Sequence, residues 1–176
     1  TIWKKTQTDQ KPEPPDGSIM RLTIIAIGKA RKGPENDLFK VFADRVLWPI
    51  TLIDVEERRP SSPAERVQRE GQLLLSRIPD GAMVVALDGG GKTLSSEAFA
   101  ARLGRYRDDG ISDVAFIIGG ADGLDPAIIN KADLVLSLGA MTWPHQMVRA
   151  MIGEQIYRGQ EILAGHPYHR AGPPPV

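Results

Sequence analysis

Short apolar runs alternate with amphipathic segments along most of the chain. Five apolar runs have the length of a β-strand and occupy residues 21–28, 50–55, 82–87, 113–118 and 133–138. Five other segments carry helix-start signals or apolar side chains at helical spacing, and they cover about 33–47, 63–78, 96–107, 126–131 and 144–163. Continuous apolar strands that alternate with helices are typical of a mostly parallel sheet with helices on both faces. The pattern therefore predicts one α/β domain, which suits a chain of 176 residues.

Three predicted helices begin with recognisable capping residues. Ser62 and Glu65 have the spacing of a capping box, and Pro63 stands at the first helical position. Ser95 and Asp125 occupy the expected N-cap positions of the next two helices. Such side chains bind backbone N–H groups that the first helical turn leaves free, so they indicate where each helix begins.

The two ends of the chain lack these patterns. Residues 1–19 are polar and contain several prolines, with no period that could bury a face, so we expect a flexible leader. Met20 is the predicted start of the folded unit, which extends to Arg170. Residues 171–176 contain three consecutive prolines and are expected to form a disordered tail.

Glycine-rich stretches follow the third, fourth and fifth predicted strands. They comprise residues 89–91, residues 119–123 and Gly139. Loops after parallel strands meet at one edge of the sheet, where ligands of α/β proteins bind, and glycine lets the backbone approach a ligand. Any one of these loops has the alternative of being a tight turn, but three together favour a small-molecule pocket.

Three common ligand or catalytic motifs are missing. Gly91, Lys92 and Thr93 match the end of a phosphate-binding loop, but Ala86 stands where that motif needs its first glycine. No GxGxxG follows the first predicted strand, and no GxSxG is present. These absences argue against a nucleotide hydrolase, a dinucleotide enzyme and a serine hydrolase.

Composition narrows the functional classes further. Lysine and arginine together number 22, as do aspartate and glutamate, so a nucleic-acid partner would have to be recognised by local patches and shape. The absence of cysteine excludes disulfides and thiolate chemistry and suits a reducing cytoplasm. No apolar run has the length of a membrane span, and no signal peptide is recognised, so we expect a soluble cytoplasmic protein.

Candidate catalytic side chains gather in the last quarter of the chain, which contains all three histidines. His145 and Arg149 are four residues apart, so they lie on one face of the last predicted helix. The start of that helix favours the neutral form of His145, whereas Arg149 has the alternative role of a surface salt-bridge partner. For Trp143, core packing is favoured over stacking on a base. The spacing of His145, His166 and His169 fits no metal site, so we expect no metal.

Five segments, in this order, closely resemble the RlmH family of the SPOUT superfamily. They are 87–92, 94–100 (LSSEAFA), 118–124 (IGGADGL), 136–145 (LSLGAMTWPH) and 166–170 (HPYHR). The combination of the last three is highly specific, and the resemblance covers the whole predicted domain. Members of this family are bacterial methyltransferases that act on N3 of a pseudouridine in large-subunit ribosomal RNA.

The resemblance implies a C-terminal trefoil knot, a homodimer, and S-adenosylmethionine as the cofactor. The implied cofactor contacts are Leu87, Gly119, Leu138, Gly139, Ala140, Met141, Thr142 and Trp143. The family usually has serine or a similar small polar residue at the position of Gly139. We therefore expect backbone groups to hold the cofactor at this position.

The implied reaction is direct methyl transfer to N3 of a pseudouridine, which must lose its proton. Candidates for proton handling are His145, Tyr168 and His169, and Arg149 is a candidate for contact with a phosphate or the developing anion. Which of them acts stays open at this point. Packing in a dimer is the alternative role of the segment that contains Tyr168 and His169.

The zero net charge favours an assembled ribosome over free RNA as the substrate, because a ribosome offers a shaped cleft of protein and RNA. We therefore expect methylation of 23S ribosomal RNA within the ribosome. Two alternatives remain: a SPOUT methyltransferase that acts on another RNA such as tRNA, and a ribosome-binding module without catalytic activity. A measurement of cofactor binding distinguishes the non-catalytic module from the enzymes. Methyl transfer to ribosomes or to tRNA distinguishes the two possible substrates.

Overall fold

The computed structural model of the protein describes residues 17, 19–59 and 61–170. In this part of the chain, one sheet contains the strands β1 (Arg21–Ile27), β2 (Ile50–Val55), β3 (Met83–Thr93), β4 (Asp113–Ile118) and β5 (Leu134–Ser137). The helices are α1 (Pro34–Ala43), α2 (Pro63–Leu75), α3 (Ser96–Asp108), α4 (Pro126–Lys131) and α5 (His145–Leu163). Most of the predicted leader and all of the predicted tail lie outside the described residues.

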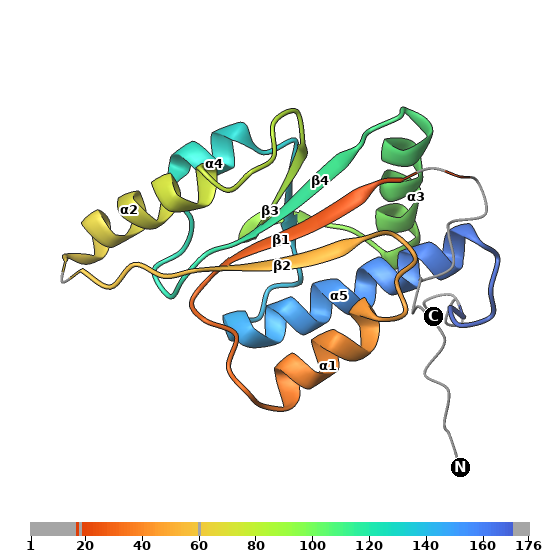
Figure 1. Ribbon diagram of the computed structural model, residues 1–176, viewed down its shortest axis with the longest axis horizontal. Helices are drawn as coiled ribbons and strands as arrows, with labels where there is room; N and C mark the ends of the chain where they lie inside the picture. Colours follow the sequence, from red (N-terminus) through yellow and green to blue (C-terminus); the bar gives the residue numbers. More distant parts are fainter. Residues whose placement is uncertain (1–16, 18, 60, 171–176) are drawn as a thin grey trace, which may run out of the picture.

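The sheet is parallel throughout, with the strand order β2-β1-β4-β3-β5. Helices α1, α3 and α5 cover one face, and α2 and α4 cover the other (Figure 1). Parallel strands need crossover connections, which explains why helices alternate with strands along the chain. The predicted α/β fold, with a parallel sheet between two helical layers, is confirmed. None of the helices in the described part of the chain combines the length and the apolar character that crossing a membrane requires.

Two apolar cores separate the sheet from its helical layers. In β1, Leu22 and Ile24 belong to the core under α1, α3 and α5, whereas Ile25 and Ile27 belong to the core under α2 and α4. Phe116 of β4 is fully buried in the first of these cores. Successive strand residues face opposite sides, so a strand covered on both faces is apolar at nearly every position. This arrangement accounts for the continuous apolar runs that predicted the strands.

Capping contacts begin α2, α3 and α4 where the sequence predicts them. The Ser62 hydroxyl accepts the Glu65 N–H at 3.3 Å, and the Glu65 carboxylate accepts the Ser62 N–H at 2.9 Å. The side chains of Ser95 and Asp125 accept N–H groups of the first turns of α3 and α4 at 3.1 and 2.7 Å. These three predicted helix starts are confirmed.

Strand β3 is longer than the sequence predicts. The apolar pattern places its end at Leu87, but the strand continues to Thr93 after a bulge, and Lys92 and Thr93 pair with β5. A Cβ atom on Gly91 would lie 2.6 Å from the carbonyl carbon of Val135, so only glycine lets the two backbones meet here. The prediction that this glycine stretch is wholly a loop after the strand is therefore wrong.

Helix α1 also differs from its prediction, because it ends at Ala43 rather than near Leu47. The chain turns at this point, where the N–H groups of Arg45 and Val46 both donate to the carbonyl of Phe42. This turn brings Val46 into the core, where it is fully buried. The apolar spacing at Val46 therefore reflects core packing beyond the end of the helix.

Candidate active site

A cleft of about 510 Å³ opens at the carboxyl edge of the sheet. It is bounded by segments that follow β4 and β5, by part of β3 and by the start of α5. Its lining includes all eight residues that the family resemblance implies for the cofactor: Leu87, Gly119, Leu138, Gly139, Ala140, Met141, Thr142 and Trp143. Pro144, His145 and Val148 add to the lining. Clefts of this size hold small organic ligands.

The loop after β5 is shaped at its beginning by Ser137 and Gly139. Gly139 has a φ of +112°, which side chains other than glycine rarely tolerate. The Ser137 hydroxyl donates to the Gly139 carbonyl at 3.1 Å and accepts the Gly139 N–H at 3.3 Å. Ser137 was not among the predicted site residues, although a polar residue at the end of a strand that enters a ligand loop is a usable signal.

Helix α2 supports the loop after β4. Arg66 forms an ion pair with Asp122 at 2.8 Å. A Cβ atom on Gly71 would lie 2.5 Å from the Cβ atom of Asp125, so α2 touches the residue that caps α4. These two contacts, one at the middle of the loop and one at its end, hold this side of the cleft in place.

A buried carboxylate faces the same loop. Glu70 of α2 is 6% exposed, and its Oε2 atom has no hydrogen-bond partner among the described residues. A Cβ atom on Gly120, which lines the cleft, would lie 2.9 Å from this oxygen. Burial raises the pKa of Glu70, whereas the positive charge of Arg66 lowers it and the negative charge of Asp122 raises it further. The helical pattern of α2 gives no sign of this burial, because a charged residue normally marks an exposed face.

His145 begins α5 and lines the cleft while remaining partly exposed. Its Nε2 atom approaches the end of β1, since a Cβ atom on Gly28 would lie 3.3 Å away. Burial lowers the pKa of His145, and the positive charges of Arg149 and Arg31 lower it further. The neutral form that the sequence predicts is therefore favoured, with burial rather than the helix start as the main cause.

Arg149 lies one turn further along α5 and is 2% exposed. Its guanidinium donates to the Asp54 carboxylate at 2.8 Å and to the carbonyls of Ile27, at 3.1 Å, and Gly28. These partners stand at the ends of β2 and β1, so Arg149 ties α5 to both strands. Burial lowers the pKa of Arg149, and Asp54 counteracts this effect. The alternative of a surface salt bridge is wrong, because the guanidinium is enclosed.

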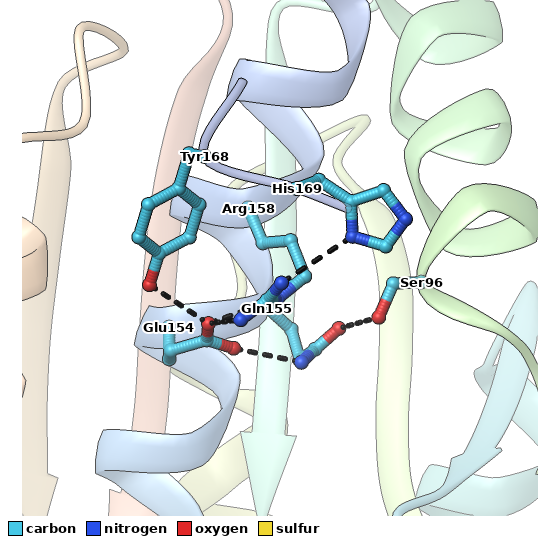
Figure 2. Close-up of polar contacts among 6 residues, drawn as sticks. All are labelled: Ser96, Glu154, Gln155, Arg158, Tyr168 and His169. Carbon is cyan, nitrogen blue, oxygen red and sulfur yellow. Dashed lines mark hydrogen bonds and ion pairs between the residues drawn. The ribbon is translucent and has the colours of Figure 1, made fainter. Parts of the chain in front are cut away.

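The HPYHR segment packs on the other half of α5, and Figure 2 shows Glu154 at the centre of its contacts. Glu154 Oε1 accepts hydrogen bonds from Tyr168 Oη at 3.1 Å and from two Arg158 nitrogens at 2.9 and 2.6 Å. Gln155 donates to the other carboxylate oxygen at 2.7 Å and accepts from the Ser96 hydroxyl at 2.7 Å. The pair Glu154–Arg158, which its spacing predicts as helix support, therefore also holds the C-terminal segment.

His169 joins this network through Arg158 (Figure 2) and also contacts Glu97 of α3. A guanidinium only donates, so His169 Nδ1 accepts the hydrogen bond from Arg158 at 3.3 Å. In a neutral imidazole the proton is then assigned to Nε2, which donates to the Glu97 carboxylate at 2.7 Å. The pKa of Glu97 is lowered to about 2 by hydrogen bonds from its own backbone, from His169 and from Ser95. The two ring nitrogens of His169 thus contact Arg158 on one side and Glu97 on the other.

Tyr168 and His169 are not among the residues that line the cleft. Their neighbours Ser96, Glu154 and Gln155 border a second, mainly apolar hollow of about 600 Å³. The four candidate catalytic residues therefore form two groups at the two ends of α5. His145 lines the cleft, and Arg149 lies one turn along α5 without lining it, whereas Tyr168 and His169 belong to the network around Glu154.

Two large apolar side chains of the cleft loop are exposed. Met141 is 74% exposed and Trp143 is 40% exposed. Core packing, the favoured interpretation of Trp143 from the sequence, is therefore wrong. Large apolar groups that line a cleft and face outward are available to a ligand or to a second macromolecule.

The three histidines make separate contacts. His145 lines the cleft, His169 contacts Glu97, and His166 pairs with Glu161 at 2.9 Å. Across the residues that the structure describes, no three or more His, Asp or Glu side chains come together in a group that could hold a metal ion.

A ligand cleft of glycine-rich loops at the carboxyl edge of a parallel sheet defines a cofactor-binding α/β protein. A family model described as predicted SPOUT methyltransferase matches residues 20–169. Ribosomal RNA large subunit methyltransferase H of Rhodospirillum centenum is 55% identical over 152 residues, which cover 86% of this chain and 100% of the relative. The protein of the same name from Paramagnetospirillum magneticum is 53% identical over 151 residues, covering 86% and 99%. The chain therefore belongs to the SPOUT methyltransferases, in the family of ribosomal RNA large subunit methyltransferase H.

Solved structures share the fold. A probable methylase family protein from Haemophilus influenzae matches with a TM-score of 0.54 at 11% identity, over 83% of this chain and 67% of that chain. A probable methyltransferase from Bordetella pertussis matches with a TM-score of 0.51 at 16% identity, over 80% and 95%. At these identities the likeness concerns the fold alone.

Proposed function

We propose that this methyltransferase transfers a methyl group from S-adenosylmethionine to N3 of a pseudouridine in 23S ribosomal RNA, within the assembled ribosome. One observation carries the proposal: the eight residues implied for the cofactor line a single cleft, and His145 lines it with them. The relatives from Rhodospirillum centenum and Paramagnetospirillum magneticum bear the name of a large-subunit ribosomal RNA methyltransferase. A ribosomal substrate also implies that the protein works in the cytoplasm.

The cleft suits S-adenosylmethionine, which supplies an electrophilic methyl group on its sulfonium. The segments 119–123 and 138–143 offer mainly backbone donors and acceptors, and Leu87 and Leu138 offer apolar surface. Gly119 keeps its part of the lining open, since a Cβ atom there would lie 3.0 Å from the Gly123 carbonyl oxygen. These groups would bind the cofactor by shape and backbone hydrogen bonds, with few charged side chains.

His145 is the proposed general base. The N3 imino group of the target must lose its proton for the nitrogen to attack, and a base serves best when its free form is populated at the working pH. The lowered pKa of His145 keeps its imidazole neutral near pH 7. Its position in the cleft lining brings it to the same space as the implied cofactor residues.

Arg149 is proposed as a positioning residue for His145. Its guanidinium already donates to Asp54 and to two backbone carbonyls, so contact with an RNA phosphate would require these buried bonds to break. Its positive charge, one turn from His145, disfavours the imidazolium form. Arg149 therefore supports the base and does not touch the RNA.

We also propose a homodimer, because Tyr168 and His169 can take part in catalysis only if they reach a cofactor cleft. Tyr168 and His169 do not line the cleft of their own chain, so a second copy would supply one. Leu38 and Val41 of α1 are each 44% exposed, and Leu38 also lines the second hollow. Exposed apolar side chains of this kind are typical of interfaces. Sedimentation equilibrium tests the dimer: Val41→Glu should yield a monomer, and a monomeric wild-type protein would refute the idea.

We further propose that the chain forms a trefoil knot near its C-terminus. Strand β5 pairs with β3, on the side away from β4, although β4 comes between them in the sequence. The chain therefore passes from β4 across β3 to the sheet edge before α5 returns over the face. An experimental structure traced through residues 113–163 would show whether this passage threads a loop.

Methyl transfer from tritiated S-adenosylmethionine tests the function. Ribosomes that lack the modification and purified tRNA are incubated separately with the protein. Label in 23S ribosomal RNA is expected, whereas label in tRNA alone would assign the enzyme to another substrate. Calorimetry with S-adenosylmethionine tests the alternative of a ribosome-binding module without catalytic activity. A protein that does not bind the cofactor and does not transfer label would be such a module.

A further inference from the structure

We infer that the loop between β1 and α1, residues 28–33, is a docking surface for the phosphates of ribosomal RNA. The inference rests on the proposed function, since it concerns how that enzyme holds its RNA. The loop has the sequence GKARKG, and its three cationic residues Lys29, Arg31 and Lys32 are exposed. Within the described part of the chain, none of these three side chains forms an ion pair. Their charges are therefore available to a partner.

The loop lies beside the proposed active site. The side-chain amide of Gln146, in the first turn of α5, donates to the Lys29 carbonyl at 2.9 Å. Gly28 is next to the ring of His145, which lines the cleft. Figure 1 shows the loop passing the beginning of α5 on its way to α1. An RNA whose target base enters the cleft would therefore bring flanking phosphates close to these cations.

Hydrogen bonds from α5 and β2 hold the backbone of the loop in place. Arg149 donates to the carbonyls of Ile27 and Gly28, and Asp54 joins Arg149 at 2.8 Å while accepting the Ala30 N–H at 2.7 Å. Gly28 has a φ of +84° and donates its N–H to the Val55 carbonyl at 2.8 Å. A fixed backbone that carries long, unpaired cations loses little conformational entropy on binding a phosphate chain.

Within the described residues, the acidic side chains near the loop form no ion pair with its three cations. Glu35 and Asp37 are in the first turn of α1, where the free N–H groups of the helix end favour negative charge. Asp54 is already paired with Arg149. The three cations therefore remain the charges that the loop presents to an RNA backbone.

A local patch is needed because the whole chain is electrically neutral, with 22 cationic and 22 acidic residues. Association with RNA depends mainly on cations that displace the counterions of phosphates. Without an overall positive field, this term must come from a small region near the cleft. Three exposed cations within four residues meet that requirement.

Replacing Lys29, Arg31 and Lys32 together by alanine tests the inference. Methylation of ribosomes is measured at several salt concentrations, and cofactor affinity is measured by calorimetry. The slope of the logarithm of ribosome affinity against the logarithm of salt concentration should become shallower by about 2 to 3, since each phosphate contact contributes roughly 0.7 to 0.9. The KM for ribosomes should rise about tenfold or more, with the cofactor affinity and the melting temperature unchanged.

A matched control uses three exposed cations at the opposite edge of the sheet. Arg77, Arg105 and Lys131 precede the starts of β3, β4 and β5, and their replacement by alanine removes the same amount of charge. The KM of this control should stay within about twofold of the wild type, because screening limits charge effects over such distances. The exchange Lys29→Arg, Arg31→Lys and Lys32→Arg keeps the loop charges and should retain the wild-type KM.

An unchanged salt slope in the loop variant, or an equal loss in the control, overturns the inference while leaving the proposed function intact. A wild-type protein that methylates no ribosomal RNA overturns the proposed function and the inference with it. Ultraviolet cross-linking identifies the partner: loop peptides linked to ribosomal RNA support the inference, and links to ribosomal protein alone refute it.

Discussion

The two halves of α5 use an arginine in different ways. In the first half, Arg149 is 2% exposed and binds Asp54 and two backbone carbonyls. In the second half, the Arg158 side chain is 26% exposed and binds Glu154, one turn away on the same helix. The first arginine joins a helix to the ends of two strands, and the second joins a helix to the C-terminal segment. Burial, which helical spacing does not reveal for a charged residue, separates a framework contact from a partly solvated one.

Removing Arg149 is expected to have the largest effect on stability. Arg149→Ala leaves the Asp54 carboxylate and two carbonyls without their donor, which should lower the free energy of unfolding by about 3 kcal/mol. The matched variant Arg158→Ala should cost about 1 kcal/mol or less, because its ion pair is partly solvated. Urea unfolding followed by circular dichroism measures both. Equal losses would remove the distinction between the two halves of α5.

Removing His145 should act on catalysis with little effect on folding. His145→Ala is expected to lower kcat roughly 100-fold, the lower range for loss of a general base, while the free energy of unfolding changes little. Single-turnover methylation of ribosomes measures the rate of the chemical step. A variant that keeps the wild-type rate would exclude His145 as the base.

The pH dependence of kcat/KM, which reports the ionisations of the free enzyme, tests the protonation state of the same residue. The pKa of His145 lies below its ordinary value of 6.5, so the basic form persists as the pH falls from the alkaline side through 6.5. The midpoint of the acidic limb should therefore lie below pH 6.5. A midpoint above 6.5 in the wild-type protein would point to a different group.

Tyr168→Phe tests the other half of α5 with a smaller change. It removes the hydrogen bond to Glu154, and we expect stability to fall by about 1 kcal/mol. If the hydroxyl also serves a partner's cleft, methylation should fall about tenfold, corresponding to the loss of about 1.4 kcal/mol in the transition state. Cofactor affinity should be unchanged. Methylation at the wild-type rate would leave this segment with a packing role only.

The smallest expected effect concerns Glu70 and depends on pH. Burial raises the pKa of Glu70 above its ordinary value of 4.5, so the native state favours the protonated carboxyl. As the pH rises above 4.5, the unfolded carboxyl ionises more readily, and the wild type loses stability relative to Glu70→Gln. The difference in melting temperature should therefore shift in favour of the variant between acidic and neutral pH, as measured by calorimetry. A difference independent of pH would show that Glu70 titrates as an ordinary carboxyl.

The fold follows from sequence wherever local rules decide it. The apolar run 113–118 predicted β4, and Ser62 predicted the start of α2, because burial on two faces and capping both act over a few residues. The extension of β3 was missed because Gly91 contacts Val135, which is distant in sequence. A glycine where two strand backbones approach closely resembles a loop glycine in the sequence, and only the partner strand reveals the difference.

The candidate site divides in a similar way. The cleft loop Leu138–Trp143 carries a specific motif, so its residues were identified without knowledge of their positions. The burial of Glu70 and Arg149 escaped prediction, because it depends on loops and strand ends that fold over charged side chains. The separation of His145 from His169 follows from the predicted helix over 144–163, whose length α5 confirms.

The most direct test of the proposed activity is nucleoside mass spectrometry of 23S ribosomal RNA after incubation of unmodified ribosomes with the protein and labelled S-adenosylmethionine. We expect one labelled methyl group per ribosome, on N3 of a pseudouridine, and almost none with the His145→Ala variant. Label on another nucleoside, on tRNA alone, or on no RNA at all would contradict it.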